Sequence, residues 1–243
     1  MRYMIILITF IFTTNSYALE NTQLNISTGE LPPYSYTKNG NLTGLAVEIV
    51  NELKTRMKYS NKIIKKPWGR VIHESKSSNQ LSFPLVRRPY RENSYKWIGP
   101  IAQDAVYFYK RKGNLTNIQT IEEAKKVNLI SSLHKGLVFS VLQKKGFTNL
   151  DPVSNQLSSI KKVVKGRVDL GVNLTPLGIK YYLKRAKLPL DSIELTPVKL
   201  IEFPLYIACS KNIPNEIIED WQKALDKIKE SGEYSKIYNK YMK

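Results

Sequence analysis

The sequence has very few of the residues that build disulfides and metal centres. Cys209 is the only cysteine and histidine occurs twice, so no disulfide can form within the chain and stability must come from packed apolar cores. There is also no cluster with metal-ligand spacing, no glycine-rich phosphate loop and no internal repeat. These absences exclude a disulfide scaffold, and we expect no metal, no other cofactor and no catalytic residue.

The sequence also lacks a long apolar run after residue 18, whereas a membrane-spanning helix needs about 20 such residues. Residues 1–18 have the features of a secretory signal. Arg2 supplies a positive charge, Met4–Phe12 is a short apolar region, and Ser16–Ala18 places small residues before a cleavage site. A membrane anchor is the alternative, but polar residues end the apolar region early. We expect cleavage after Ala18 and a periplasmic protein of residues 19–243.

Acidic residues are the third scarcity, since 38 Lys and Arg outnumber 20 Asp and Glu. After removal of the signal the net charge is +17, and residues 109–200 alone carry +11. Such a charge is compatible with nucleic acid, an anionic surface, an anionic ligand, or a lysine-rich composition without functional meaning. An exported protein seldom meets nucleic acid, so we expect no nucleic-acid partner. The separate charge of residues 109–200 indicates a separate lobe.

The first part of the mature chain alternates short strands, loops and one clear helix. Leu24–Thr28 reads as a strand that a rigid loop with Tyr34 and Tyr36 interrupts, and Gly44–Met57 has the apolar spacing of a helix. A second strand, Lys62–Lys66, precedes Trp68. Loops at strand ends are natural ligand walls, so Tyr34, Tyr36 and Trp68 are candidate contacts. Ordinary turn and core packing is the alternative for all three.

Three arginines lie within five positions of the segment Ser82–Pro100, at the end of a predicted strand, Gln80–Val86. They are Arg87, Arg88 and Arg91. An arginine fork can bind both oxygens of a carboxylate, which predicts a site for a carboxylate-bearing ligand. The alternative is a solvated basic loop.

Strands and helices alternate between residues 113 and 200, which predicts a largely parallel sheet. Ligands of such sheets gather at the carboxyl ends of strands and at helix N-termini. That rule selects one loop with Lys135 and Gly136 and a second loop with Asn173 and Thr175.

The ordered set of motifs resembles the bacterial extracellular solute-binding protein family 3, the polar amino-acid-binding components of ABC importers. The resemblance covers essentially the whole mature chain. It rests on the Pro-Pro-Tyr loop, the Gly-Leu-x-Val-Glu-Ile-Val helix, Pro-Trp-x-Arg, Pro-Leu-x-Arg-x-Pro-x-Arg-Glu and Tyr-Lys-Trp-Ile-Gly-Pro-Ile.

The resemblance implies an α/β fold of two lobes, each a mostly parallel sheet flanked by helices, joined by two hinge crossovers. Residues 19–108 and 201–243 would form lobe 1, and residues 109–200 would form lobe 2. A monomer would close on an amino acid or similar small carboxylate and work with the membrane subunits of an ABC importer.

In the family, an arginine of lobe 1 binds the ligand carboxylate and an acid of lobe 2 commonly holds its ammonium group. The arginine matches Arg91, and Arg88 stands where many members have threonine. The acid position falls at Leu174, which cannot pair with an ammonium group. The expected ligand-binding residues are therefore Arg91, Arg88, Tyr34, Tyr36, Trp68, Glu30, Pro84, Lys135, Gly136, Asn173 and Thr175.

Three other functions remain open from the sequence. One is an enzyme similar to cyclohexadienyl dehydratases, for which Glu30 is the only cleft-side acid that we can name. The second is a periplasmic protein that reports ligand to a sensor. The third is a basic protein that binds anionic surfaces, for which binding would depend strongly on salt.

Overall fold

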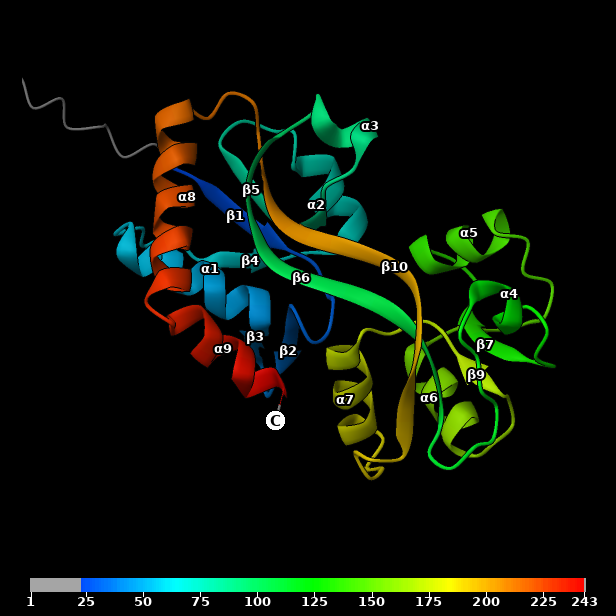
Figure 1. Ribbon diagram of the computed structural model, residues 1–243. Helices are drawn as coiled ribbons and strands as arrows, with labels where there is room; N and C mark the ends of the chain where they lie inside the picture. The colour runs from blue at the N-terminus through cyan, green and yellow to red at the C-terminus, as the bar shows by residue number, and fades with distance from the viewer. Residues whose placement is uncertain (1–22, 243) are drawn as a thin grey trace, which may run out of the picture.

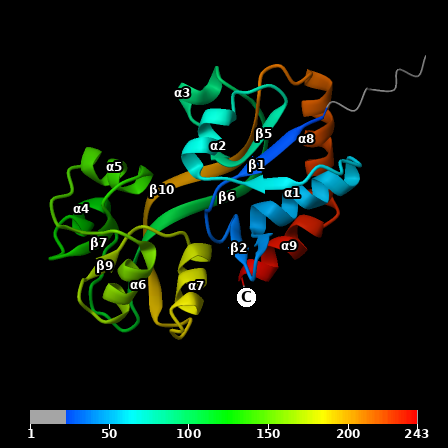
Figure 2. The same cartoon turned by 180° about the vertical axis from the view of Figure 1, so that it is seen from behind.

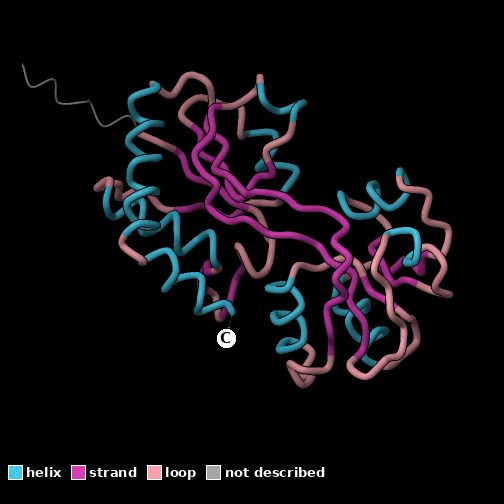
Figure 3. The backbone as a smooth tube through the Cα atoms, in the orientation of Figure 1, coloured by secondary structure: helices cyan, strands magenta, loops and turns pink. Residues whose placement is uncertain are grey.

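The computed structural model describes residues 23–242, so the expected secretory signal lies outside the described residues. Two groups of elements lie at the two ends of a pair of long strands, β6 (Lys96–Arg111) and β10 (Ile193–Cys209) (Figure 1). The tube view shows this pair running from one group into the other (Figure 3). None of the described helices is long and apolar enough to cross a membrane.

The first group contains the N-terminal and C-terminal parts of the described chain. Its elements are β1 (Asn25–Thr28), β2 (Tyr36–Lys38), β3 (Asn41–Thr43), α1 (Leu45–Arg56), β4 (Ile63–Lys65), α2 (Trp68–Glu74), β5 (Gln80–Val86), α3 (Pro89–Glu92), α8 (Asn215–Glu230) and α9 (Glu233–Met242). The second group contains α4 (Ile121–Ala124), β7 (Ile130–Leu133), α5 (Leu137–Lys144), β8 (Leu150–Val153), α6 (Gln156–Val164), β9 (Leu170–Gly171) and α7 (Pro176–Arg185).

The described strands form one large sheet and one hairpin. The large sheet has the order β4-β1-β5-β10-β6-β9-β7-β8, and β2 pairs with β3 separately. The outer pairs β4–β1, β1–β5, β9–β7 and β7–β8 are parallel, whereas β6 and β10 pair antiparallel with each other and with their neighbours. Helices flank this mostly parallel sheet, which confirms the predicted α/β fold class.

The two long strands differ from the sequence prediction, which places two shorter extended runs in each. Alternating apolar residues predict Tyr95–Pro100 and Ala105–Tyr109 in place of β6, and Ile193–Val198 and Phe203–Ser210 in place of β10. The predicted break between Val198 and Phe203 coincides with register shifts in the β10–β6 pairing, at Leu195/Lys199 and Lys199/Ile201. These irregularities disturb the alternation of buried and exposed side chains without ending the strand. Both connections between the groups are therefore continuous strands.

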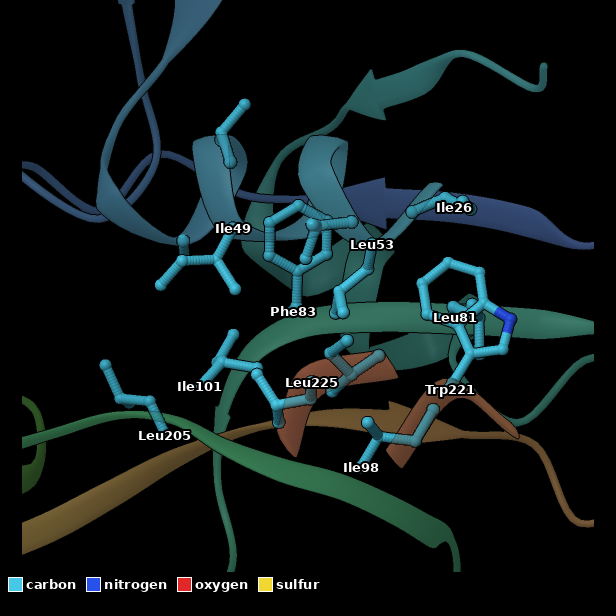
Figure 4. Packing of buried hydrophobic residues seen from close by; sticks show 14 of the residues in the cluster. Ile26, Ile49, Leu53, Leu81, Phe83, Ile98, Ile101, Leu205, Trp221 and Leu225 are labelled. Atoms are coloured by element: carbon cyan, nitrogen blue, oxygen red, sulfur yellow. The ribbon is translucent and has the colours of Figure 1, made fainter. Parts of the chain in front are cut away.

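The first group has a single large apolar core, in which β1, β5, α1 and α8 contribute the central side chains (Figure 4). Trp221 of α8 and Phe83 of β5 are its largest fully buried side chains. Leu53 and Ile49 of α1 pack against them, as the apolar stripe of the predicted helix requires. Leu177 of α7, an element of the second group, also belongs to this core.

The second group has two smaller cores, one around Phe108 and Phe147 and one around Tyr109. Polar side chains cap its helices: Thr120 and Glu123 form a capping box at α4, and Asn155 and Thr175 cap α6 and α7. The cap fixes the start of α7 at Thr175, a residue that also contacts the first group of elements.

Candidate ligand-binding site

The three clustered arginines differ in their surroundings, beginning with Arg87. Its side chain is exposed, yet Nε lies 2.9 Å from Oε2 of Glu92 and a second contact makes an ion pair. The same guanidinium lies 5.8 Å from the ring centroid of Trp97 and 5.5 Å from that of Tyr206. Arg87 is therefore neutralised and held within its own loop.

Arg91 has a fixed position without such neutralisation. It lies in the short helix α3, where Nη1 donates a hydrogen bond of 3.1 Å to the carbonyl of Val86 and the guanidinium lies 5.3 Å from the ring centroid of Tyr90. Arg88 is the N-cap of the same helix. Within residues 23–242, no acidic side chain forms an ion pair with Arg88 or Arg91. A carboxylate from outside the chain can therefore occupy the free donors of Arg91.

Trp68 and Glu30 lie together at the ends of β1 and β4. The indole Nε1 donates to the carbonyl of Glu30 at 2.8 Å, and the ring packs directly on Gly29, where a Cβ would lie 2.4 Å from the indole. The Glu30 carboxylate is exposed and forms an ion pair with Lys65 at 2.7 Å. Trp68 thus has a fixed orientation at the ends of β1 and β4, while the carboxylate of Glu30 is already paired.

On the second group, Lys135 and Gly136 lie at the start of α5 and both are exposed. Gly136 is the N-cap, with φ 97°, and no side chain caps the helix. The first N–H groups of a helix lack intrahelical acceptors, so this end favours a negatively charged group. Figures 1 and 2 show α5 on the same side of the long strands as α2 and α3.

Asn173 and Leu174 are buried in the second group. The Asn173 amide accepts from the N–H of Leu133 at 2.7 Å and donates to the carbonyl of Ser131 and the hydroxyl of Ser159, each at 3.2 Å. Leu174 packs in the core around Tyr109. The position that the resemblance aligns with an acid is thus apolar in surroundings as well as in side chain.

Tyr34 joins the two groups of elements through hydrogen bonds. Its hydroxyl donates to the carboxylate of Asp104 in β6. The hydroxyl of Thr175, at the start of α7, lies 3.2 Å from the hydroxyl oxygen of Tyr34. Thr175 also accepts from the N–H of Gly178 as the helix cap. The structure therefore brings together Tyr34 and Thr175, two of the predicted residues that lie 141 positions apart.

Asp104 is the member of this cluster that the sequence reading missed. Burial raises the pKa of its carboxyl above the ordinary value, although hydrogen bonds from Tyr34, the N–H of Ala105 and Thr175 act in the opposite direction. Burial and the charge of Asp104 in turn raise the pKa of Tyr34 well above its usual range. Within the described residues, Asp104 is the carboxyl group with a raised pKa.

The two remaining predicted residues, Pro84 and Tyr36, have other neighbours. Pro84 is buried in β5, and its peptide bond with Phe83 is cis. Tyr36 packs against Tyr181 of α7, with ring centroids 4.9 Å apart. Within residues 23–242, no hydrogen bond or ion pair joins Arg88 or Arg91 to Lys135, Gly136 or Asn173.

The raised pKa of Asp104 predicts a pH-dependent effect of Asp104→Asn. Because the folded protein binds this proton more tightly than the unfolded chain, ionisation of Asp104 costs stability as the pH rises through the raised pKa. Asparagine removes the charge and keeps an acceptor for Tyr34. We expect the melting temperature of the variant, relative to the unchanged protein, to be higher at pH 7.5 than at pH 4.

An amide group does not titrate, so any cost of placing it at this position is the same at every pH. It shifts the difference in melting temperature between variant and unchanged protein by a constant. The readout is therefore the change in the difference in melting temperature between pH 4 and pH 7.5. A flat difference would show that Asp104 does not titrate differently in the folded and unfolded protein.

The family model of the bacterial extracellular solute-binding proteins, family 3, matches residues 24–243. The chain is 26% identical over 225 residues to the probable amino-acid-binding protein YxeM of Bacillus subtilis. The match covers 88% of this chain and 81% of YxeM.

Solved structures share the fold at lower identity. The probable amino-acid ABC transporter extracellular-binding protein ytmK of Bacillus subtilis is 17% identical, with a TM-score of 0.74 over 90% of this chain and 97% of that one. An ancestral amino acid-binding protein, described as a precursor of cyclohexadienyl dehydratase, is 20% identical, with a TM-score of 0.68 over 90% and 96%. The match of the family model along nearly the whole chain identifies this protein as a member of the bacterial extracellular solute-binding proteins, family 3.

Proposed function

We propose that the protein binds an amino acid or a similar small carboxylate between two lobes in the periplasm and delivers it to an ABC importer. Residues 19–108 with 201–243 form the first lobe of this proposal, residues 109–200 form the second, and cleavage after Ala18 releases the chain. Membership of a solute-binding family, and the likeness to proteins named for amino-acid binding, support this function.

The observation that carries the proposal is the state of Arg91. Its guanidinium is held by the carbonyl of Val86 and lacks a carboxylate partner among the described residues, whereas Arg87 in the same loop is ion-paired with Glu92. A ligand carboxylate completes the coordination of Arg91, with Arg88 as a second contact for a more anionic ligand. Trp68 supplies an oriented aromatic face, and the N-terminus of α5 supplies N–H donors from the other lobe.

Closure of the lobes is the proposed mechanism. The strands β6 and β10 act as the hinge, and a ligand that touches both lobes stabilises the closed arrangement by its difference in affinity between the two states. Tyr34, Asp104 and Thr175, together with Leu177, form the contact between the lobes that closure preserves.

A thermal-shift screen tests the proposal. The panel contains the common L-amino acids, succinate and a prephenate-like compound, each at 1 mM, followed by calorimetry on the compound with the largest shift. We expect at least one amino acid or small carboxylate to raise the melting temperature, with small-angle scattering showing a more compact particle. If no amino acid or carboxylate in the panel raised the melting temperature, the proposed ligand class would be wrong.

An enzyme on the same fold is the second candidate, and Asp104 is the observation that favours it. A carboxyl with a raised pKa can act as a general acid, and one structural neighbour is described as a precursor of cyclohexadienyl dehydratase. Incubation with the prephenate-like compound separates the two functions. Product formation that Asp104→Asn abolishes would favour the enzyme, and unchanged compound would favour binding alone.

A further inference from the structure

A cavity with a volume of about 510 Å³ lies between the two groups of elements. On one side it is lined by Pro33, the β2–β3 hairpin, α1 and α9, and on the other side by α7. Figures 1 and 2 both show α7 beside these elements. The volume falls within the roughly 300–1,000 Å³ of small-molecule sites. We call this cavity the α7 groove; the residues of the proposed amino-acid site, Tyr36 excepted, do not line it.

The α7 groove has an unbalanced charge. Among the residues that the structure describes, five cationic side chains line it, and the single carboxylate is that of Glu48. This carboxylate is already occupied, because Lys240 Nζ lies 2.8 Å from Oε2 and the hydroxyl of Tyr241 donates to Oε1 at 2.6 Å. Little of the negative charge of Glu48 is therefore left for a second cation.

Three of the cationic residues have no ion pair within the part of the chain that the structure describes. They are Lys38 on the hairpin and Lys184 and Arg185 in the last turn of α7. Like charges around one cavity repel one another, and a cavity with low-dielectric walls strengthens their field. A ligand with two or more negative charges relieves this repulsion at several positions at once.

Tyrosine rings form the rest of the wall. Tyr36 of β2 and Tyr181 of α7 meet edge to face from opposite sides of the groove, and Tyr241 of α9 lies close to them. Burial, followed by the nearby Tyr181 and Glu48, raises the pKa of Tyr36, so its hydroxyl stays protonated at neutral pH and can donate to an anion. The lining thus combines point charges, hydroxyl donors and apolar ring surface.

We propose that the α7 groove is a second ligand site, which binds a small polyanion such as a polycarboxylate or a phosphate-bearing molecule. Because its walls come from both groups of elements, the bound polyanion stabilises the arrangement in which α7 contacts the β2–β3 hairpin. Apart from Tyr36, this site shares no residue with the proposed amino-acid site, and binding here does not depend on that site.

The test compares two matched pairs of substitutions in the full mature chain. Lys184→Gln with Arg185→Gln removes two exposed cations from the end of α7, and Lys144→Gln with Lys145→Gln removes two exposed cations from the end of α5, outside the groove. Both pairs lose the same charge and the same favourable position at a helix C-terminus. Circular dichroism verifies that each variant is folded.

Citrate and inorganic pyrophosphate serve as probes for the two kinds of polyanion, at constant ionic strength so that general screening is equal. We expect calorimetry to show binding of at least one probe to the unchanged protein and to the α5 variant, and at least tenfold weaker binding to the α7 variant. The probe that binds more tightly assigns carboxylate or phosphate as the preferred group. Equal weakening in both variants would reveal a general charge effect, and absence of binding of both probes to the unchanged protein would equally overturn the proposal.

Discussion

An Arg91→Ala variant is expected to bind its carboxylate ligand about 10- to 150-fold more weakly than the unchanged protein. A hydrogen bond to a charged group contributes about 1.5–3 kcal/mol, and each 1.4 kcal/mol changes affinity tenfold. The loss follows from the geometry of Arg91, whose guanidinium is fixed by Val86 and has no acidic partner in residues 23–242. Calorimetry with the amino acid or carboxylate selected by the thermal-shift screen measures the effect.

Arg87→Ala is the matched control, since it removes the same charge from the same loop. Arg87 already pairs with Glu92, so we expect its loss to change affinity by less than a factor of about 3 and to lower stability slightly, in keeping with an exposed ion pair. Arg91→Lys keeps the charge but not the fork, and an intermediate affinity would identify bidentate binding. Equal affinities of Arg91→Ala and Arg87→Ala would remove Arg91 from the site.

The second large effect concerns stability, for which Trp221→Ala is expected to cost about 3–5 kcal/mol of unfolding free energy. Trp221 is fully buried in the core of the first group, and its ring lies 5.6 Å from that of Tyr59. Truncation leaves a cavity between α8 and the sheet (Figure 4). Urea unfolding monitored by circular dichroism measures the loss.

Trp221→Phe separates volume from polarity. The indole Nε1 of Trp221 is buried and has no hydrogen-bond partner within the described chain, and an unpaired buried donor costs about 1–3 kcal/mol. Phenylalanine removes this donor while it retains a large ring, so we expect a much smaller loss than for alanine. Equal losses for the two variants would show that the ring volume of phenylalanine does not compensate at this position.

Local sequence patterns predicted the regular elements because burial on one face leaves a periodic signal. The strand Gln80–Val86 was predicted with its observed bounds, and the helix predicted for Gly44–Met57 is α1, Leu45–Arg56. The prediction failed where periodicity is interrupted without a break in hydrogen bonding, as in β10. It also gave no sign that Pro89–Glu92 forms the short helix α3 within the arginine loop.

The tertiary cluster around Asp104 was beyond the reach of sequence patterns. Its partners are Tyr34 and Thr175, about 70 residues away on either side, and only the pairing of β6 with β10 and the start of α7 bring them together. Asp104 alone, in a run of mostly apolar residues, was the available signal. Arg91 was proposed as a ligand-binding residue because its neighbours follow a family pattern, whereas Asp104 belongs to no such motif in the sequence.

The packing of Trp68 on Gly29 also gives the protein a built-in optical reporter. Of the three tryptophans, Trp221 is sealed in the core and Trp97 lies among Tyr95, Tyr206 and Arg87. Trp68 alone combines partial solvent exposure with a location at the proposed amino-acid site. If the proposed site is correct, we expect ligand binding to change the emission of Trp68, whose ring is held in one orientation by close packing on Gly29.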